Sequence, residues 1–276
     1  MLPVLFELGP ITVYSYGVLL AASYLLALFY AVRRARRFGL DASRVLDLGI
    51  YIIISALVGA KLLLLIVDFD QFRRQPAELW TLVRSGGVFY GGLVLALLVA
   101  LWYVRKHRLP VWRVADAVAP SIALGHVVGR FGCLLAGCCY GKPTSMPWGI
   151  TFTDPFAASN VGTPLHVHLH PTQLYDAGAE FLILAFLLAT ERFWRRRTGW
   201  TFWAYILLYG ISRFVIEFYR GDPRGATMGF STSQWISMVL VPLSLVMIGL
   251  LWRKAPAPAA AAGDAPPPAR RKKRGR

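Results

Sequence analysis

Residues 47–67 read DLGIYIIISALVGAKLLLLIV, and this stretch decides the fold class. It carries charge only at Asp47 and Lys61, and large aliphatic side chains fill most of the other positions. About 20 helical residues are needed to cross the roughly 30 Å of hydrocarbon in a bilayer. The stretch therefore predicts a membrane-spanning helix, in which the backbone satisfies its own hydrogen bonds.

Six further stretches have a similar length and composition. Unbroken aliphatic runs favour helices over the alternating strands of a membrane barrel. Of the 276 residues, 56% are hydrophobic and only 16% are charged, which disfavours a soluble domain with a polar surface. The predicted class is all-α, a polytopic membrane protein with about seven transmembrane helices. The predicted spans are 11–32, 47–67, 86–104, 114–136, 176–194, 200–219 and 232–252.

The first predicted span is expected to stay in the mature protein. No basic region precedes it and no small-residue cleavage site follows it, in contrast to a signal peptide.

The net charge of +16 does not indicate a nucleic-acid-binding protein, and the positions of the basic residues instead predict how the chain is oriented in the membrane. The Lys and Arg residues lie in clusters between the apolar runs, so no single soluble face is basic. Counted on alternate sides of the seven spans, one side carries 21 of them and the other 6. Because short cytoplasmic loops are enriched in Lys and Arg, the N-terminus is predicted outside and the C-terminus in the cytoplasm.

The chain is expected to divide into a membrane domain and a tail. The membrane domain covers 1–254 and includes a Pro- and aromatic-rich loop at about 137–175, which is predicted to form an outward-facing cap. Residues 255–276 are rich in Ala, Pro and basic residues, and are predicted to be disordered in the cytoplasm and attracted to anionic membrane lipids.

Arg130 and Arg213 fall inside predicted spans, where a charge costs at least about 2.5–3.5 kcal/mol. Arginines in such places usually pair or line a polar cavity, and two guanidinium groups in one cavity would suit a lipid phosphate. Glu217 lies one helical turn after Arg213, so a purely structural ion pair is the alternative. For Lys61 a structural role and a role in the site are both left open, because its long side chain can reach the membrane interface.

Three tyrosines, Tyr16, Tyr90 and Tyr209, each precede a glycine within or at the edge of a span. Buried tyrosine hydroxyls normally find a hydrogen-bond partner, which makes these residues candidates for the cavity lining. Tyrosines of the membrane interface are the alternative.

Three cysteines and three histidines raise the question of a metal. His166, His168 and His170 share a face only if their segment is extended, and no second pair has the usual zinc spacing. The cysteines are more often small helix-packing residues than a redox centre. We therefore predict no metal ion and no cofactor. The cysteines are Cys133, Cys138 and Cys139.

Several motifs together resemble the prolipoprotein diacylglyceryl transferase family. The run VAPSIALGHVVGRFGCLLAGCCYGKPT is similar to the family signature, with Gly129, Arg130 and Gly132 on its core. The similarity covers most of the chain between about Tyr14 and Trp235. The other matching motifs are SYG at 15–17, GGVFYGG at 86–92, HPTQLYDA at 170–177 and YGISRFVIEFYRGD at 209–222.

This resemblance implies an enzyme that transfers the diacylglyceryl group of phosphatidylglycerol to the lipobox cysteine of a prolipoprotein signal peptide. It implies glycerol phosphate as the other product, and a cavity open to the bilayer and the outer side of the bacterial cytoplasmic (inner) membrane. Carried over by position, the catalytic residues are Arg130, Arg213 and Tyr90. The substrate-binding residues are Arg130, Arg213, Tyr16, Tyr209, Glu217, Gly129, Gly132, His170 and Gln173.

The chain departs from the family pattern in two places. Tyr90 stands where well-studied members have a histidine, and Cys133 and Cys138 stand where many members have Asn and Glu. A paralogous lipid transferase with another acceptor remains an alternative, as do a transporter or channel and a membrane thiol oxidoreductase.

Overall fold

A computed structural model describes residues 2–9, 11–75, 87–194, 197–223 and 225–253 of the chain. The described part is mostly helical, in agreement with the predicted class. Three small antiparallel strand pairs, β1 with β2, β3 with β4 and β5 with β6, accompany the helices. The strands are β1 (Val4–Leu8), β2 (Ile11–Tyr14), β3 (Ile150–Thr151), β4 (His168–Leu169), β5 (Ala226–Thr227) and β6 (Phe230–Ser231). The helices are α1 (Ser15–Arg37), α2 (Ala42–Val67), α3 (Phe69–Arg74), α5 (Phe89–Lys106), α6 (Val111–Ala136), α7 (Pro155–Val161), α8 (Thr172–Trp194), α9 (Trp200–Glu217) and α10 (Thr232–Arg253).

Six described helices are long and apolar enough to cross a membrane, which makes this a multi-pass membrane protein. They are α1, α2, α5, α6, α8 and α10. The seventh predicted span, 200–219, is helical as α9, but it carries Arg213 and Glu217 and is not one of these six.

The predicted start of the first span was wrong. Residues 11–14 form strand β2, which pairs with β1, and the helix begins only at Ser15. The β-branched and aromatic side chains of ITVY suit a strand, so this hairpin leads into the helix.

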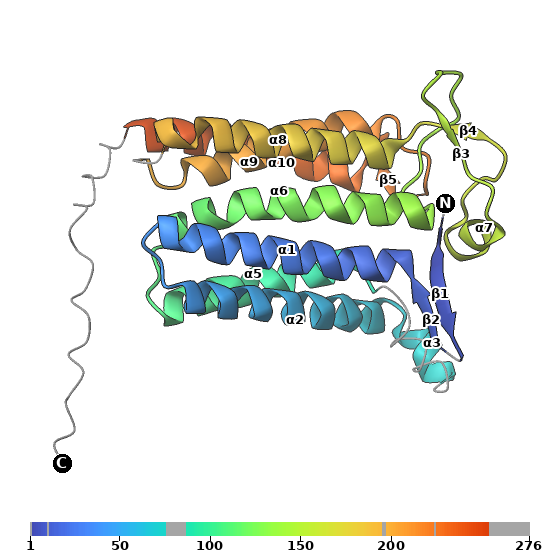
Figure 1. Cartoon of the computed structure of the whole chain (residues 1–276), viewed down its shortest axis with the longest axis horizontal. Helices are drawn as coiled ribbons and strands as arrows, with labels where there is room; N and C mark the ends of the chain where they lie inside the picture. Colours follow the sequence, from blue (N-terminus) through green and yellow to red (C-terminus); the bar gives the residue numbers. More distant parts are fainter. Residues whose placement is uncertain (1, 10, 76–86, 195–196, 224, 254–276) are drawn as a thin grey trace, which may run out of the picture.

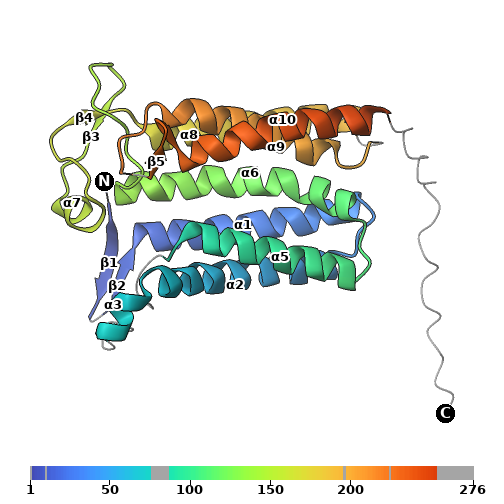
Figure 2. The ribbon, with the colours of Figure 1, turned by 180° about the vertical axis from the view of Figure 1, so that it is seen from behind.

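The long helices run side by side in layers, with α6 near the middle (Figures 1 and 2). Helix α6 packs against α1 on one side and against α8 and α9 on the other. Helices α2 and α5 pack together beyond α1, and α10 packs on α9. The helix that carries Arg130 is therefore enclosed by neighbours from both halves of the chain.

Glycines bring α1 and α6 close together, as in many membrane helix pairs. A Cβ atom at Gly132 would lie 3.3 Å from the Cβ of Leu19, and one at Gly125 would lie 3.2 Å from the Cβ of Ala27. The closest atom to such a Cβ at Gly129 is the Ser23 hydroxyl, at 3.9 Å. This face of α6 is therefore a helix-packing face.

The end of the bundle where α1 stops and α9 begins is closed by buried charges. Arg34 is almost fully buried; its guanidinium binds Glu191 at 3.0 and 3.1 Å and donates to the Ala117 carbonyl at 2.9 Å. Arg34 comes directly after the first predicted span, within a basic cluster, and its burial could not be read from that cluster. Asp116 accepts hydrogen bonds from the backbone N–H groups of Gly199 and Phe202 and so stabilises the start of α9.

Residues 137–175 form a small folded unit at the opposite end (Figure 1). Tyr140, Phe152 and Leu169 make its buried apolar cluster, with the pair β3–β4 and the short helix α7 around it. The predicted tail, 255–276, lies outside the described residues.

Candidate active site

Arg130 lies on α6 near the folded unit and is paired with a carboxylate. Its Nη1 atom is 3.2 Å from Oδ2 of Asp176, which comes from the first part of α8. The Arg130 side chain is 21% exposed, whereas that of Asp176 is 7% exposed. The pair is thus held in position on one side and remains accessible on the arginine side.

A second arginine, Arg220, shares the same carboxylate. Its Nη1 is 3.5 Å from Oδ2 of Asp176, and its Nε and Nη2 atoms each lie 2.9 Å from Asp222 in a bidentate pair. The sequence analysis counted Arg220 as a loop cation, but its side chain is only 2% exposed. The signal that could have revealed it is the RGD run directly after the apolar helix, which places Asp222 two residues from Arg220.

Arg213 forms the predicted ion pair with Glu217 one turn later on α9. Its Nη2 atom also donates a hydrogen bond of 3.1 Å to the Ser233 hydroxyl at the start of α10. Its Nη1 atom is buried and has no hydrogen-bond partner among the described residues. A structural pair alone would leave this donor unsatisfied, which disfavours the purely structural alternative.

A histidine–carboxylate pair lies in the same part of the bundle, and the sequence analysis assigned it no role. Nδ1 of His126 is 2.6 Å from Oε1 of buried Glu180, and the Tyr205 hydroxyl is 3.4 Å from the same nitrogen. His126 precedes Arg130 by four residues and Glu180 follows Asp176 by four. The sequence signal for this pair was that both helices carry two polar residues at the same four-residue spacing, which places each two on one helical face.

The three predicted tyrosines occupy different places. Tyr209 packs its ring 5.7 Å from that of His126. A Cβ at Gly132 would lie 3.5 Å from the ring of Tyr16, so Tyr16 covers the C-terminal part of α6. Tyr90 stands in the first turn of α5, and within the described part of the chain it forms no hydrogen bond to Arg130 or Arg213.

His170 and Gln173 organise the start of α8. The Gln173 side chain is fully buried and donates a hydrogen bond of 2.7 Å to the Cys138 carbonyl. Nδ1 of His170 is 3.1 Å from the Tyr175 hydroxyl. His168 instead contacts Thr151 and the Met146 carbonyl. These two histidines therefore have separate partners and do not converge on one point.

Gly141 and Gly221 lock three backbone segments together beneath the folded unit. A Cβ at Gly141 would lie 2.6 Å from the Cβ of His170, and one at Gly221 would lie 2.5 Å from the Gly141 carbonyl oxygen. Backbone hydrogen bonds join Lys142 to Tyr219 and to His170 across this junction. The junction fixes the end of α9, and with it Arg220, against the start of α8.

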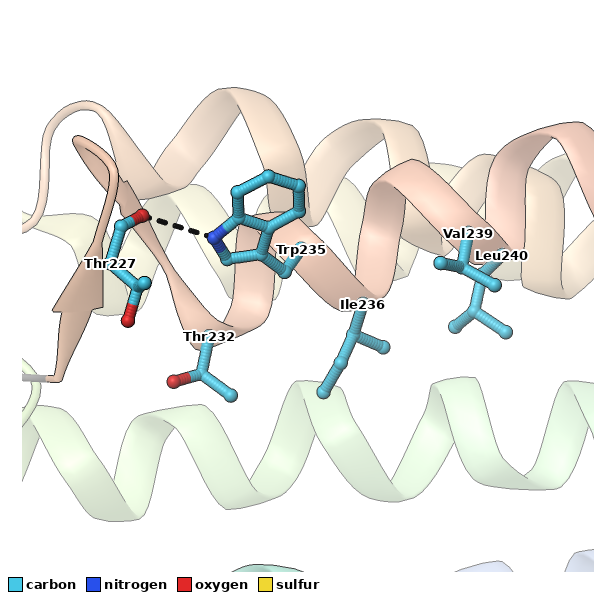
Figure 3. A pocket seen from close by; sticks show the side chains of 6 residues that line it. All are labelled: Thr227, Thr232, Trp235, Ile236, Val239 and Leu240. Carbon is cyan, nitrogen blue, oxygen red and sulfur yellow. Dashed lines mark hydrogen bonds between the residues drawn. The ribbon is translucent and has the colours of Figure 1, made fainter.

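A mostly apolar pocket of about 550 Å³ lies along the first half of α10 (Figure 3). The helix that carries it also supplies Ser233, the partner of Arg213. In Figure 3 the side chains of Thr232 and Ile236 point from α10 toward the neighbouring helix. The lining residues are Thr227, Thr232, Trp235, Ile236, Val239 and Leu240.

The arrangement suits an anionic group attached to apolar chains. Arg130, Arg213 and Arg220 bring three planar donor groups into one end of the bundle, where a low dielectric strengthens their interaction with phosphate oxygens. Carboxylates hold each guanidinium in position. One donor of Arg213 and the accessible side of Arg130 remain for a ligand.

The chain is similar to known proteins over nearly its whole length. The family model "Prolipoprotein diacylglyceryl transferase" matches residues 3–250. A phosphatidylglycerol–prolipoprotein diacylglyceryl transferase from Clostridium tetani is 38% identical and covers 91% of this chain and 98% of its own. A second such enzyme, from Clostridium perfringens, is 33% identical, and the match covers 86% of this chain and 91% of the relative. A third, from Solidesulfovibrio magneticus, is 33% identical, and the match covers 92% of this chain and 95% of the relative. With a match of this extent, the chain belongs to the prolipoprotein diacylglyceryl transferase family.

Proposed function

We propose that this protein transfers the diacylglyceryl group of phosphatidylglycerol to the lipobox cysteine of prolipoproteins, the first step of lipoprotein maturation. The observation that carries the proposal is the unsatisfied buried donor of Arg213 at the end of the bundle that also holds Arg130 and Arg220. A phosphate is an anion that can satisfy it and that membrane lipids supply.

In this reaction the acceptor sulfur attacks the carbon of the diacylglyceryl group that is bonded to the phosphate oxygen. A carbon–sulfur bond forms, the carbon–oxygen bond breaks, and the electron pair leaves on the phosphate oxygen of glycerol phosphate. Arg130 and Arg213 bind this phosphate and stabilise the negative charge that grows on it. Tyr209 and Tyr16 complete the lining, and Glu217 keeps Arg213 oriented.

The proton of the acceptor thiol goes to His126. Glu180 accepts a hydrogen bond from Nδ1 of His126, which leaves Nε2 as the free acceptor. Tyr90 is a poor base, because a tyrosine would have to lose its own proton first. Its hydroxyl and the His170 side chain help to position the substrates, whereas Gly129 and Gly132 pack against α1 and Gln173 holds the backbone at Cys138.

The lipid chains enter from the bilayer through the apolar pocket along α10, beside Ser233 and Arg213. Helix α9 is the seventh membrane helix, since its charged residues face buried partners. The N-terminus lies outside and the C-terminus in the cytoplasm, as the distribution of Lys and Arg indicates. The site then opens to the bilayer and the outer side of the bacterial inner membrane, where a signal peptide presents its cysteine.

The direct test uses purified protein in nanodiscs. With phosphatidylglycerol and a lipobox peptide, we expect a peptide whose mass has increased by one diacylglyceryl group, together with free glycerol phosphate. A peptide with Ser in place of Cys is the control and should stay unmodified. Product with phosphatidylglycerol but with a different acceptor would point to a paralogous transferase. Absence of lipid product combined with solute flux in vesicles would favour a transporter.

A further inference from the structure

The three cysteines lie together at the end of α6. Their Sγ atoms all lie within 4.8 Å of one another, and none of the three is in a disulfide. The sequence analysis treated them as packing residues because the linear spacing matched no usual zinc pattern. The structure changes this interpretation, because the chain reverses between the first and the other two.

A helix-ending turn produces this convergence. Gly137 follows the last helical residue with a φ of 78°, the left-handed conformation that glycine adopts at such ends. The chain then folds back, so that the Cys138 thiol lies 3.7 Å from the Cys133 carbonyl oxygen. Cys139 has a φ of 60°, which is uncommon for any residue with a side chain.

Buried side chains from α8 hold the turn in this shape. The Thr172 hydroxyl donates a hydrogen bond of 2.7 Å to the Cys139 carbonyl, and Gln173 donates one of the same length to the Cys138 carbonyl. Both donors are fully buried. A turn that contains a left-handed residue and is held by two buried donors is rigid. Strained backbone of this kind concentrates at functional sites.

The surroundings are basic, because the guanidinium groups of Arg220 and Arg130 lie near the Cys139 thiol. Thiolates are the form in which cysteine binds metals. Three thiolates together would repel one another strongly, whereas a divalent cation between them would leave a net charge of only −1 beside the two arginines.

We propose that Cys133, Cys138 and Cys139 form a three-thiolate site for one soft metal ion of the Zn²⁺ class. With Zn–S bonds of about 2.3 Å, tetrahedral ligation sets the sulfur atoms about 3.8 Å apart, so small side-chain rotations suffice. Thiolate ligands select Zn²⁺ and similar soft ions over Mg²⁺ and Ca²⁺. Three protein ligands leave a fourth position for an external ligand.

The test measures metal binding in the purified full-length protein and needs no activity assay. Protein stripped with a chelator is titrated with Cd²⁺, whose bonds to thiolates give an ultraviolet charge-transfer band. We expect one equivalent of Cd²⁺ to produce the band and a large excess of Zn²⁺ to compete for the same site, while excess Mg²⁺ has no effect. The triple variant C133S/C138S/C139S should lose the band, and Cys139→Ser should weaken Zn²⁺ binding by about a hundredfold or more.

Two controls keep the result interpretable. The variant H166Q/H168Q removes two of the three histidines that the sequence offers as metal ligands, and it should bind Cd²⁺ as the wild type does. Single Cys→Ser variants that remain monodisperse exclude misfolding as the reason for a lost band. The proposal is overturned if wild type and triple variant give the same titration, or if alkylation and mass spectrometry find two of the thiols joined in a disulfide. Lipidation activity is independent of these readouts, so failure here leaves the proposed function standing.

Discussion

The two ends of the bundle both contain buried arginines, but they use them differently. At the end where α9 begins, Arg34 directs its Nε and both Nη atoms at protein acceptors, and Asp116 is bonded to backbone N–H groups. At the opposite end, Arg213 keeps an unsatisfied donor and Arg130 is partly accessible. Fully satisfied charges stabilise a helix arrangement, whereas spare donors on positioned arginines are available to a ligand.

The largest expected effect concerns the end of the bundle that holds Arg130 and Arg213. Arg130→Lys and Arg213→Lys should each lower the rate of peptide lipidation by at least about a thousandfold, much as Arg→Ala does, because an ammonium group lacks the planar fork that binds two phosphate oxygens. The measurement is the initial rate in nanodiscs. Arg33→Lys, a cation one residue away from the structural Arg34, is the matched control and should keep the wild-type rate. Normal turnover by either lysine variant would contradict the phosphate-binding role.

At the end of the bundle that holds Arg34, a substitution should change the stability of the protein more than its activity. Arg34→Ala removes the ion pair with Glu191 and the hydrogen bonds to two carbonyl groups, and loss of one member of a buried pair costs about 3–5 kcal/mol. We expect a lower unfolding temperature in detergent, with the lipidation rate of the remaining folded protein within a few-fold of wild type. The double variant R34M/E191L should recover part of the stability. If Arg34→Ala abolished activity without loss of stability, the two ends would not differ as described.

The proposed proton acceptor should have an intermediate effect. His126→Gln removes the base while it keeps a polar side chain of similar size, and general base catalysis typically contributes about 10²–10⁴-fold. We expect a loss of about a hundredfold at pH 7 that diminishes toward pH 9, because a free thiol of pKa about 8.5 then ionises without help. Initial rates from pH 6 to 9 test this. His170→Ala serves as the comparison and should keep the wild-type pH profile.

Among the variants of the proposed site, Tyr90→Phe should have the smallest effect on the rate, roughly ten- to a hundredfold, since only one hydroxyl that positions a substrate is lost. The same pH series measures it. A Tyr90→Phe variant as inactive as the arginine variants would mean that this residue takes part in the chemistry and that His126 is not the main base.

Most of the membrane architecture could be predicted because it depends on local composition. Apolar runs of about 20 residues mark helices wherever they pack, and the sequence placed all six helices that the structure identifies as candidate spans. Errors arose where local signals compete. Residues 11–14 continue an apolar run but form a strand, and Arg34 belongs to a basic cluster but points into the core.

For the site, the sequence determined which residues are unusual in a membrane. An arginine such as Arg130 or Arg213 within an apolar run can be recognised as costly before its partner is known. Only the tertiary structure decided which groups meet. Asp176 lies 46 residues from Arg130 and 44 from Arg220, yet one carboxylate oxygen holds both. His126 and Glu180, and the three thiols around the turn at Gly137, likewise come together through helix packing and chain reversal. Linear spacing alone does not specify such contacts, because they depend on how α6, α8 and α9 pack against one another.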